Sequence, residues 1–467
     1  MRVNGQQVFF HSPLYDILSY IFMFKRKIYN KIKEWKDTSQ GKTALLIEGA
    51  RRIGKSTVVE EFARNEYKSY ILIDFSIASN EVKEMFEDMS DLNYFFLQLQ
   101  LHYHVELENR NSVIIFDEVQ LCPKARQAIK FLVKDGRYDY IETGSLISIK
   151  KNVKDILIPS EERKLQMHPM DYEEFLWALD DKTTMSLLKM TFDNKKKLGD
   201  QLNRKLMRSF RLYMLVGGMP QAVNEYIQTN NFKKVDDIKR DIINLYEDDF
   251  RKIDSTGRLA LLFEAIPSQL NKNTKGFQTK KILNSYKTED TTILSLISEL
   301  KDSKTISVAY HANNPEIGLS AYKDLNLFKL YMADTGLFVT LQFKDRDFTE
   351  NTIYEKLLND KLSTNLGYLY ENAVAQILIA NGHDLFYYTF KNLEQKRNYE
   401  IDFIISKKNK ICPIEVKSSN YKKHTSIDEF YKKYSSRILE RYIIHTKDVS
   451  KDQDILCLPI YLTQFIL

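Results

Sequence analysis

The sequence predicts an α/β protein that begins with a parallel β-sheet covered by helices on both faces. Short apolar runs with strand composition recur along the first part of the chain, and segments with helical spacing lie between successive runs. A glycine-containing turn follows the first of these runs directly. Because strands that alternate with helices are joined as parallel neighbours, the pattern indicates a sheet wound with helices on both sides.

The elements expected in this part follow one another without an internal repeat or a low-complexity tract. A basic amphipathic helix is expected over residues 25–37, with Ile28, Ile32 and Trp35 turned inward. Five strands are then expected, in the order "TALLIE", "SYILIDFS", "SVIIFDE", "YDYIETGS" and "RKLQMHP".

The remainder of the chain changes character twice. The helical pattern is continuous to about residue 255, except at "VGGMP", where two glycines and a proline must interrupt it. Short helices and a hairpin-like element follow, and the last part combines a long helix, "GYLYENAVAQILIANG", with four strand patterns. These changes predict four regions, at residues 1–165, 166–255, 256–345 and 346–467.

Composition and length indicate a protein of several domains. The 467 residues are 43% apolar and 28% charged, an ordinary balance for a soluble chain. The three cysteines stand far apart, without zinc-site or disulfide spacing, which favours a reducing cytoplasm. The longest apolar stretches are too short for a bilayer span and the N-terminus lacks a signal-peptide pattern, so no membrane partner is expected. The net charge of +6 permits nucleic-acid binding without requiring it.

The turn after the first strand has the spacing of a phosphate-binding loop. In "IEGARRIGKS", residues 47–56, Gly49, Gly54, Lys55 and Ser56 match the pattern G-x-x-x-x-G-K-[ST]. Such a loop points backbone N–H groups at the phosphates, while its lysine reaches the outer phosphates and its hydroxyl holds Mg²⁺. A plain strand-to-helix turn would also use glycine here. Both alternatives need a strand before the loop and a helix after it, and both are expected.

A later strand supplies the acidic partners that a nucleoside triphosphatase needs. In "SVIIFDEVQ", Asp117 follows four apolar residues and Glu118 is next, at the carboxyl end of the strand, where ligands of such sheets bind. Asp117 is expected to hold the Mg²⁺ shell and Glu118 to polarise the attacking water. Loop and strand together predict Mg²⁺-dependent ATP binding and hydrolysis, with Arg52 and Thr57 as additional nucleotide contacts.

Three further residues are candidates for roles at the phosphates. Thr143 and Ser145 follow the fourth strand, where a polar side chain would sense the terminal phosphate, and Ser145 is expected to contact the nucleotide. The Thr-Gly-Ser sequence is also ordinary turn chemistry. Arg163 is either a finger that acts on the nucleotide of a neighbouring copy, in a homo-oligomer, or a solvated strand-edge arginine.

These motifs together resemble a known family. "LLIEGARRIGKST", "VIIFDEVQ", "IETGSLIS" and "HPMDYEEFL" look like bacterial and archaeal AAA-type P-loop ATPases of the additional-strand class, within the AAA+ superfamily. "YMLVGGMPQAV" resembles their helical lid, and "FKLYMADTGLF", "LYENAVAQIL", "EIDFII" and "PIEVKSS" are similar to the uncharacterised C-terminal region often fused to them. Members often carry Gly-Arg before the fifth strand, where this chain has "EERK", which weakens the finger role of Arg163.

The resemblance implies an architecture for each of the four regions. It implies a central sheet of order 5-1-4-3-2 in the P-loop core. The implied parts are this core over 1–165, a helical lid over 166–255, a winged-helix module over 256–345 and a restriction-endonuclease-like α/β domain over 346–467.

The C-terminal part contains the residue types of a metal-dependent phosphodiesterase centre. Such a centre needs an Asp on one strand and Glu-x-Lys on the next, so that carboxylates hold a divalent ion while the lysine orients or activates water. "YEIDFII" supplies Asp402, "PIEVKSS" supplies Glu415 and Lys417, and Glu371 on the preceding helix is a fourth member. Mg²⁺ or Mn²⁺ is the expected ion. The alternative is a surface ion pair between Glu415 and Lys417, although the apolar flanks favour a cleft.

DNA is the partner expected for the middle and C-terminal parts. "TKGFQTKKILNSY" offers Lys275, Lys280, Lys281 and Lys287 to a phosphate backbone, although lysines at this spacing also form ordinary solvated faces. The favoured function is a DNA-directed ATPase with a nuclease-like C-terminal domain. The alternatives are a nucleotide-dependent switch without cleavage and a protein-remodelling ATPase, for which no aromatic substrate-threading loop is recognisable.

Overall fold

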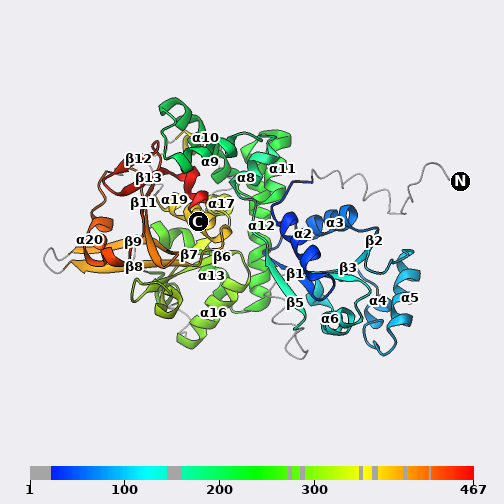
Figure 1. Ribbon diagram of the computed structural model, residues 1–467. Coiled ribbons are helices and arrows are strands. Elements are labelled where there is room, and N and C mark those ends of the chain that lie inside the picture. Colours follow the sequence, from blue (N-terminus) through cyan, green and yellow to red (C-terminus); the bar gives the residue numbers. More distant parts are fainter. Residues whose placement is uncertain are drawn as a thin grey trace.

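Two β-sheets organise the part of the chain that the computed structural model describes (Figure 1). A five-stranded sheet lies in the N-terminal part and an eight-stranded sheet in the C-terminal part, with the long helix α12 (Phe232–Ile253) between them. The described residues are 23–144, 160–271, 276–283, 290–345, 351–359, 367–392, 397–419 and 422–466.

The N-terminal sheet is entirely parallel, and its strand order is β2-β3-β4-β1-β5. This confirms the expected order 5-1-4-3-2 and all five expected strands. Every residue of the three central strands is buried, because apolar cores cover both faces of the sheet. The strands are β1 (Ala44–Glu48), β2 (Ser69–Asp74), β3 (Ser112–Asp117), β4 (Asp139–Gly144) and β5 (Glu162–Gln166).

The helices around this sheet follow the predicted alternation. The first one buries Ile28, Ile32 and Trp35, as expected, and ends at Gln40, which has a left-handed backbone conformation. Helix α3 packs on one face of the sheet, and α5 and α6 pack on the other. These elements are α2 (Ile28–Ser39), α3 (Lys55–Glu66), α4 (Asn80–Glu84), α5 (Leu92–Tyr103), η1 (Val119–Leu121) and α6 (Pro123–Asp135).

Helices continue after β5, and the predicted break at "VGGMP" is present. Gly217 has φ 85°, and a Cβ at Gly218 would lie 2.1 Å from the carbonyl oxygen of Met170, so both positions require glycine. The next helix begins directly afterwards, with Pro220 as its first residue. The helices are α8 (Tyr172–Ala178), α9 (Thr184–Asn194), α10 (Asp200–Val216), α11 (Pro220–Thr229) and α12.

Helix α12 contacts both halves of the molecule. In its first half, the buried ammonium of Lys239 donates hydrogen bonds to the carbonyl oxygen of Gly336 and the hydroxyl of Tyr354, at 3.2 and 2.8 Å. In its second half, the hydroxyl of Tyr246 donates to the carbonyl oxygen of Arg51 at 2.9 Å. One helix therefore joins the loop after β1 to the C-terminal part.

The middle region contains short helices and then a hairpin, as expected, but the hairpin does not form a separate module. Strand β6 pairs in parallel with β8 (Leu385–Asn392), through Ala309 and Leu385 among others, so it belongs to the second sheet. The expected boundary at residue 345 therefore falls inside one continuous sheet. The elements are α13 (Arg258–Glu264), α14 (Ile266–Asn271), α15 (Thr279–Ile282), α16 (Asp290–Asp302), β6 (Ile306–Ala312), η3 (Leu319–Tyr322) and β7 (Lys323–Met332).

The second sheet is mixed and has the order β12-β13-β11-β10-β9-β8-β6-β7. The predicted long helix is α19, whose buried residues join the main core, while α20 packs through Ile427 and Phe430 into a separate core on the sheet. No helix in the described stretches is long and apolar enough to cross a bilayer. The remaining elements are α17 (Thr335–Gln342), α18 (Asn351–Leu358), α19 (Gly367–Ala380), β9 (Arg397–Lys407), β10 (Lys410–Val416), α20 (Thr425–Tyr434), η4 (Ser435–Arg437), β11 (Arg441–His445), β12 (Ser450–Asp452), β13 (Ile455–Pro459) and η5 (Ile460–Phe465).

A buried histidine at the end of β11 makes this part of the fold sensitive to acid. His445 is 2% exposed, and burial, with a smaller effect of Lys447, lowers its pKa to about 4. In the unfolded chain a histidine titrates near ~6.5. Between these values only the unfolded state binds the proton, so stability is present above pH ~6.5 and is lost as the pH falls towards 4.

The free energy of unfolding falls between pH 7 and pH 4.5, and we expect His445→Asn to make this fall smaller by about 2 kcal/mol. The asparagine oxygen can replace Nδ1 as the acceptor for the backbone N–H of Lys447, which lies 2.8 Å from it in the parent. Urea unfolding at both pH values, for parent and variant, measures the difference. An equal loss of stability in the two proteins would rule out His445 as the acid-sensitive group.

Candidate functional site

The loop between β1 and α3 has the backbone geometry of a phosphate cradle. A Cβ at Gly49 would lie 2.6 Å from the carbonyl oxygen of Met167, so only glycine fits there. Gly54 has φ 90° and lies against Pro220, whose Cγ is 3.6 Å from the position of a Cβ. No described side chain caps the first turn of α3. The N–H groups of this turn are therefore available to an anion.

Lys55 is held inside this loop. Its ammonium donates hydrogen bonds to the carbonyl oxygens of Gly49 and Ala50, at 3.1 and 2.9 Å, and the residue is 6% exposed. Burial lowers the pKa of Lys55 to about 8, and the charges of Glu118 and Asp117 oppose that change. The ammonium of Lys55 thus lies inside the loop, near the two carboxylates at the end of β3.

The structure brings Ser56 and Asp117 together, as the motif predicts. The hydroxyl of Ser56 donates a hydrogen bond of 2.8 Å to Oδ1 of Asp117, which is 6% exposed at the end of β3. The buried hydroxyl of Thr143 donates to the same oxygen from the neighbouring strand β4. Ser145, the other residue expected here, lies outside the described residues. A hydroxyl and a carboxylate at this position are oxygen ligands of the kind that Mg²⁺ prefers.

Glu118 follows directly and has an unusual backbone. Its φ is 51°, in the left-handed region, and its carboxylate accepts a hydrogen bond from the side-chain amide of Gln120. The carboxylate is half-buried beside Asp117, where a base for the attacking water is expected.

The other residues expected at the nucleotide lie around the loop. Arg52 is exposed and has φ 67°, and Thr57 is exposed on the first turn of α3. Arg163 is exposed on β5 and donates to the hydroxyl of Thr38 at 3.4 Å. Their roles at a nucleotide remain predictions.

Three contacts that the sequence did not predict fix the loop from outside. Arg51 pairs with both carboxylate oxygens of Asp249 on α12, at 2.9 and 2.8 Å. Arg26 donates to the carbonyl oxygen of Ile53 at 2.7 Å. The third is the hydrogen bond from Tyr246 described above. Arg51 and Asp249 are 198 positions apart in the chain, so no local pattern could have revealed the pair.

A second group of charged residues lies where β9 and β10 separate; we name it the C-terminal cluster. The antiparallel ladder ends at the pair Phe403–Ile414, and beyond it the carboxylate of Asp402 accepts the backbone N–H of Val416 at 2.7 Å. Burial, and then the charge of Glu371, raise the pKa of Asp402 well above its usual range. The cluster consists of Lys329, Glu371, Glu400, Asp402, Glu415 and Lys417.

Glu415 and Lys417 form an ion pair, but not the surface pair considered as the alternative. The ammonium lies 2.6 Å from Oε1 of Glu415, which is 3% exposed. Its second oxygen, Oε2, is buried without a hydrogen-bond partner in the described part of the chain. Burial raises the pKa of Glu415, and Lys417 partly offsets this. A buried carboxylate with a hydrogen-bond partner on only one of its oxygens lowers the stability of the folded state. A gain in stability alone therefore does not explain this ion pair.

Lys329 and Glu400 complete the cluster, and Tyr331 lies beside them; none of the three was predicted from the sequence. The ammonium of Lys329 lies 3.2 Å from Glu371 and also pairs with Glu400, while the hydroxyl of Tyr331 donates to Glu371. The signal that could have found Lys329 is its position among the apolar residues of "LFKLYM".

The described geometry does not fit a metal ion at the C-terminal cluster. Among the residues that the structure describes, no group of three or more His, Cys, Asp or Glu side chains is arranged to hold one. The physical reason is that one oxygen of each carboxylate already has a donor. Glu371 and Glu400 are bound to Lys329, Glu415 to Lys417, and Asp402 to a backbone N–H.

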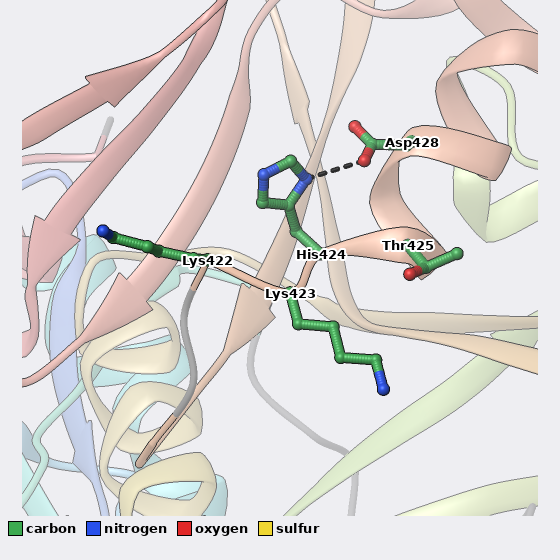
Figure 2. Close-up of a pocket in the computed structure, with 5 residues that line it drawn as sticks. All are labelled: Lys422, Lys423, His424, Thr425 and Asp428. Carbon is green, nitrogen blue, oxygen red and sulfur yellow. Dashed lines mark hydrogen bonds and ion pairs between the residues drawn. The ribbon is translucent and has the colours of Figure 1, made fainter.

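A basic pocket of about 460 Å³ lies at the start of α20 (Figure 2). The exposed Lys422 and Lys423 extend from it in different directions, and the ring of His424 turns towards Asp428. His424 lies 2.7 Å from Asp428 and 3.1 Å from Asp452; burial lowers its pKa, but these two carboxylates raise it more. The pocket therefore carries two lysine side chains, and a histidine whose protonated form is favoured by two neighbouring carboxylates.

Three segments of the chain match family models. Residues 41–176 match a model described as an AAA domain. Residues 207–347 match a domain of unknown function (DUF8612), and residues 366–463 match another domain of unknown function (DUF4143). No match was found among curated proteins.

Several solved structures are similar over much of the chain. The Walker-type ATPase PABY2304 of Pyrococcus abyssi is 16% identical, with a TM-score of 0.42, over 68% of this chain and 96% of that one. Cdc6p from Pyrobaculum aerophilum is 11% identical, with a TM-score of 0.27, over 74% and 98%. The Holliday junction branch migration motor RuvB of Thermotoga maritima is 11% identical, with a TM-score of 0.29, over 61% and 89%. Scores this low carry no weight for fold or function.

The AAA-domain match spans the loop, the acidic end of β3 and the whole parallel sheet. Sequence motif, strand order and the contact between Ser56 and Asp117 all agree with it. Residues 41–176 thus form a P-loop ATPase domain of the AAA type, in a chain that continues into two domains of unknown function.

Proposed function

We propose that the chain hydrolyses ATP in its AAA domain with the help of Mg²⁺, and that DNA bound by its middle and C-terminal parts controls this reaction. The observation that carries the ATPase is the hydrogen bond between Ser56 and Asp117, 2.8 Å long, beside the buried ammonium of Lys55. These three groups are the hydroxyl, carboxylate and lysine that a magnesium nucleotide requires.

Each residue of the site has a separate task in this proposal. The N–H groups at the start of α3 and the ammonium of Lys55 bind the phosphates. Ser56 and Asp117 hold Mg²⁺, which supplies positive charge to the phosphate oxygens when it is bound. Glu118 accepts the proton of the attacking water. Thr143 donates to Asp117 and so keeps that carboxylate oriented.

Exposed lysines outside the AAA domain support DNA as the partner. Lys280 and Lys281 are exposed on α15, and Lys422 and Lys423 line the basic pocket; Lys275 and Lys287 lie outside the described residues. Lysines of this kind bind phosphate backbones without reading sequence. We therefore expect binding that weakens steeply with salt and depends little on DNA sequence.

The C-terminal cluster allows two versions of this function. In the first, Asp402, Glu415 and Lys417, with Glu371, cleave DNA with Mg²⁺ or Mn²⁺. In the second, the C-terminal part binds DNA without cleaving it, and the protein is a nucleotide-dependent switch. The ion pairs of Lys329 and Lys417 favour the second version, because they occupy the carboxylates that an ion would need.

ATP turnover by the full-length chain, with and without double-stranded or single-stranded DNA, tests the proposal. We expect DNA to raise the rate several-fold in the parent and equally in Asp402→Asn, because Asp402 lies on β9, outside the AAA domain, and is not one of the lysines proposed to bind DNA. A rate that neither DNA changes would contradict the role of DNA, and stimulation by an unfolded polypeptide instead would favour protein remodelling.

A cleavage assay with Mg²⁺ and Mn²⁺ on the same preparation separates the two versions. Cleavage by the parent that disappears in Asp402→Asn would establish the first version. DNA-stimulated ATP turnover without cleavage would establish the second, which we expect from the paired carboxylates.

A further inference from the structure

The C-terminal cluster holds more negative than positive side chains in a buried setting. Lys417 pairs with Glu415, whereas Lys329 pairs with both Glu371 and Glu400. Lys329 is therefore the cation that balances the inner carboxylates of the cluster.

The position of Lys329 in β7 suits it to this task. Alternation along the strand places Lys329 and Tyr331 on the same face of the sheet, and both contact Glu371. The side chain of Lys329 is 8% exposed, and its ammonium lies 5.3 Å from the ring of Tyr387. A lysine buried this deeply stays charged only if carboxylates compensate for the lost water, and here two of them do.

A divalent ion held between Glu371 and Glu400 would compete with Lys329. Mg²⁺ and Mn²⁺ bind carboxylate oxygens, and Oε1 of Glu371 and Oε1 of Glu400 already accept hydrogen bonds from the ammonium. An ion bound to these two oxygens would displace the ammonium, which would leave a buried lysine unpaired. We infer that Lys329 is the internal cation of the C-terminal cluster and keeps the cluster closed to divalent ions. This inference rests on the second version of the proposed function, in which the C-terminal part does not cleave.

Titration of the nucleotide-free, full-length chain with Mn²⁺, parent beside Lys329→Met, tests the inference by calorimetry. The substitution frees the oxygens of Glu371 and Glu400, so we expect Mn²⁺ to bind roughly tenfold more tightly, or better, than in the parent. Thermal unfolding gives a second readout. Without ions the variant should melt below the parent, because its carboxylates repel one another, and Mn²⁺ should restore much of the loss.

Three further variants make the test specific. Tyr331→Phe removes a hydrogen bond to Glu371 but no charge, so it should show no gain in Mn²⁺ binding. The double variant Lys329→Met/Asp402→Asn should lose the gain, which would place the ion in the C-terminal cluster and not at Ser56 and Asp117. Lys329→Gln removes the charge but keeps amide donors for both glutamates, and it replaces Lys329→Met if that protein does not fold.

Mn²⁺ binding of equal strength in the parent and in Lys329→Met would overturn the inference, and so would the absence of binding in both folded proteins. The proposed function fails independently of this result. If DNA leaves ATP turnover unchanged in the parent, the proposed function is contradicted whatever the Mn²⁺ titration shows. DNA cleavage by the parent with Mn²⁺ would contradict a closed cluster directly.

Discussion

Replacing Lys55 by alanine is expected to abolish tight ATP binding. The ammonium of Lys55 is buried within the loop, with the carbonyl oxygens of Gly49 and Ala50 as its partners. It is the charged group placed to reach the outer phosphates. Losing one side of a buried charge-assisted contact costs about 3 kcal/mol or more, which is over ~100-fold in the dissociation constant.

Equilibrium binding of a fluorescent ATP analogue measures this effect, with Lys42→Ala as the matched control. Lys42 is exposed just before β1, on the opposite end of the same strand, and its removal should leave affinity unchanged. Affinity in Lys55→Ala equal to that of the parent would show that the loop does not bind the nucleotide.

Replacing Glu118 by glutamine is expected to separate binding from hydrolysis. Glutamine keeps the size of the side chain and can still bond to Gln120, so the loop and Asp117 should hold the nucleotide as before. It cannot accept a proton from water, and loss of a general base slows a reaction by roughly 10²–10⁴-fold.

Single-turnover hydrolysis, together with ATP affinity, tests this separation. Glu108→Gln is the matched control, because Glu108 lies beyond the opposite end of β3 and pairs with Lys68 at the surface. If Glu118→Gln hydrolysed ATP at the parental rate, Glu118 could not be the base.

The N-terminal half of the fold was predictable because its signals are local. The three central strands of the first sheet are short buried runs, and residues with helical spacing follow β1 and β3. The order of the strands is not local, and it came from the resemblance of the motifs to AAA-type ATPases. The contact between Ser56 and Asp117 follows from that order, because parallel strands bring their carboxyl ends to one edge of the sheet.

The second sheet shows what local patterns cannot supply. The sequence predicted a hairpin after short helices, and the hairpin is present, but its partner is a strand far along the chain, through Ala309 and Leu385. Pairing between distant segments is set by packing and not by propensity. The expected boundary at residue 345 was placed where the local pattern changes, and the sheet runs across it.

Only part of the C-terminal cluster was predicted, because some of its members come from distant parts of the chain. Asp402, Glu415 and Lys417 stand close in sequence on two strands, so their patterns showed a shared location. Lys329 arrives from β7, and neither of its partners, Glu371 and Glu400, is a neighbour in sequence. The position of Lys329 inside an apolar strand indicated a buried charge, but the sequence did not show which carboxylates pair with it.

Phosphate release from ATP by the full-length chain, with Mg²⁺ and with the ion removed by a chelator, is the decisive measurement of the ATPase site. We expect turnover that requires Mg²⁺, because Ser56 and Asp117 are arranged to hold the ion beside the phosphates. We also expect this turnover to disappear in Glu118→Gln. Phosphate release that persists without Mg²⁺, or that is unchanged in Glu118→Gln, would contradict an ATPase site built from this loop and the acidic end of β3.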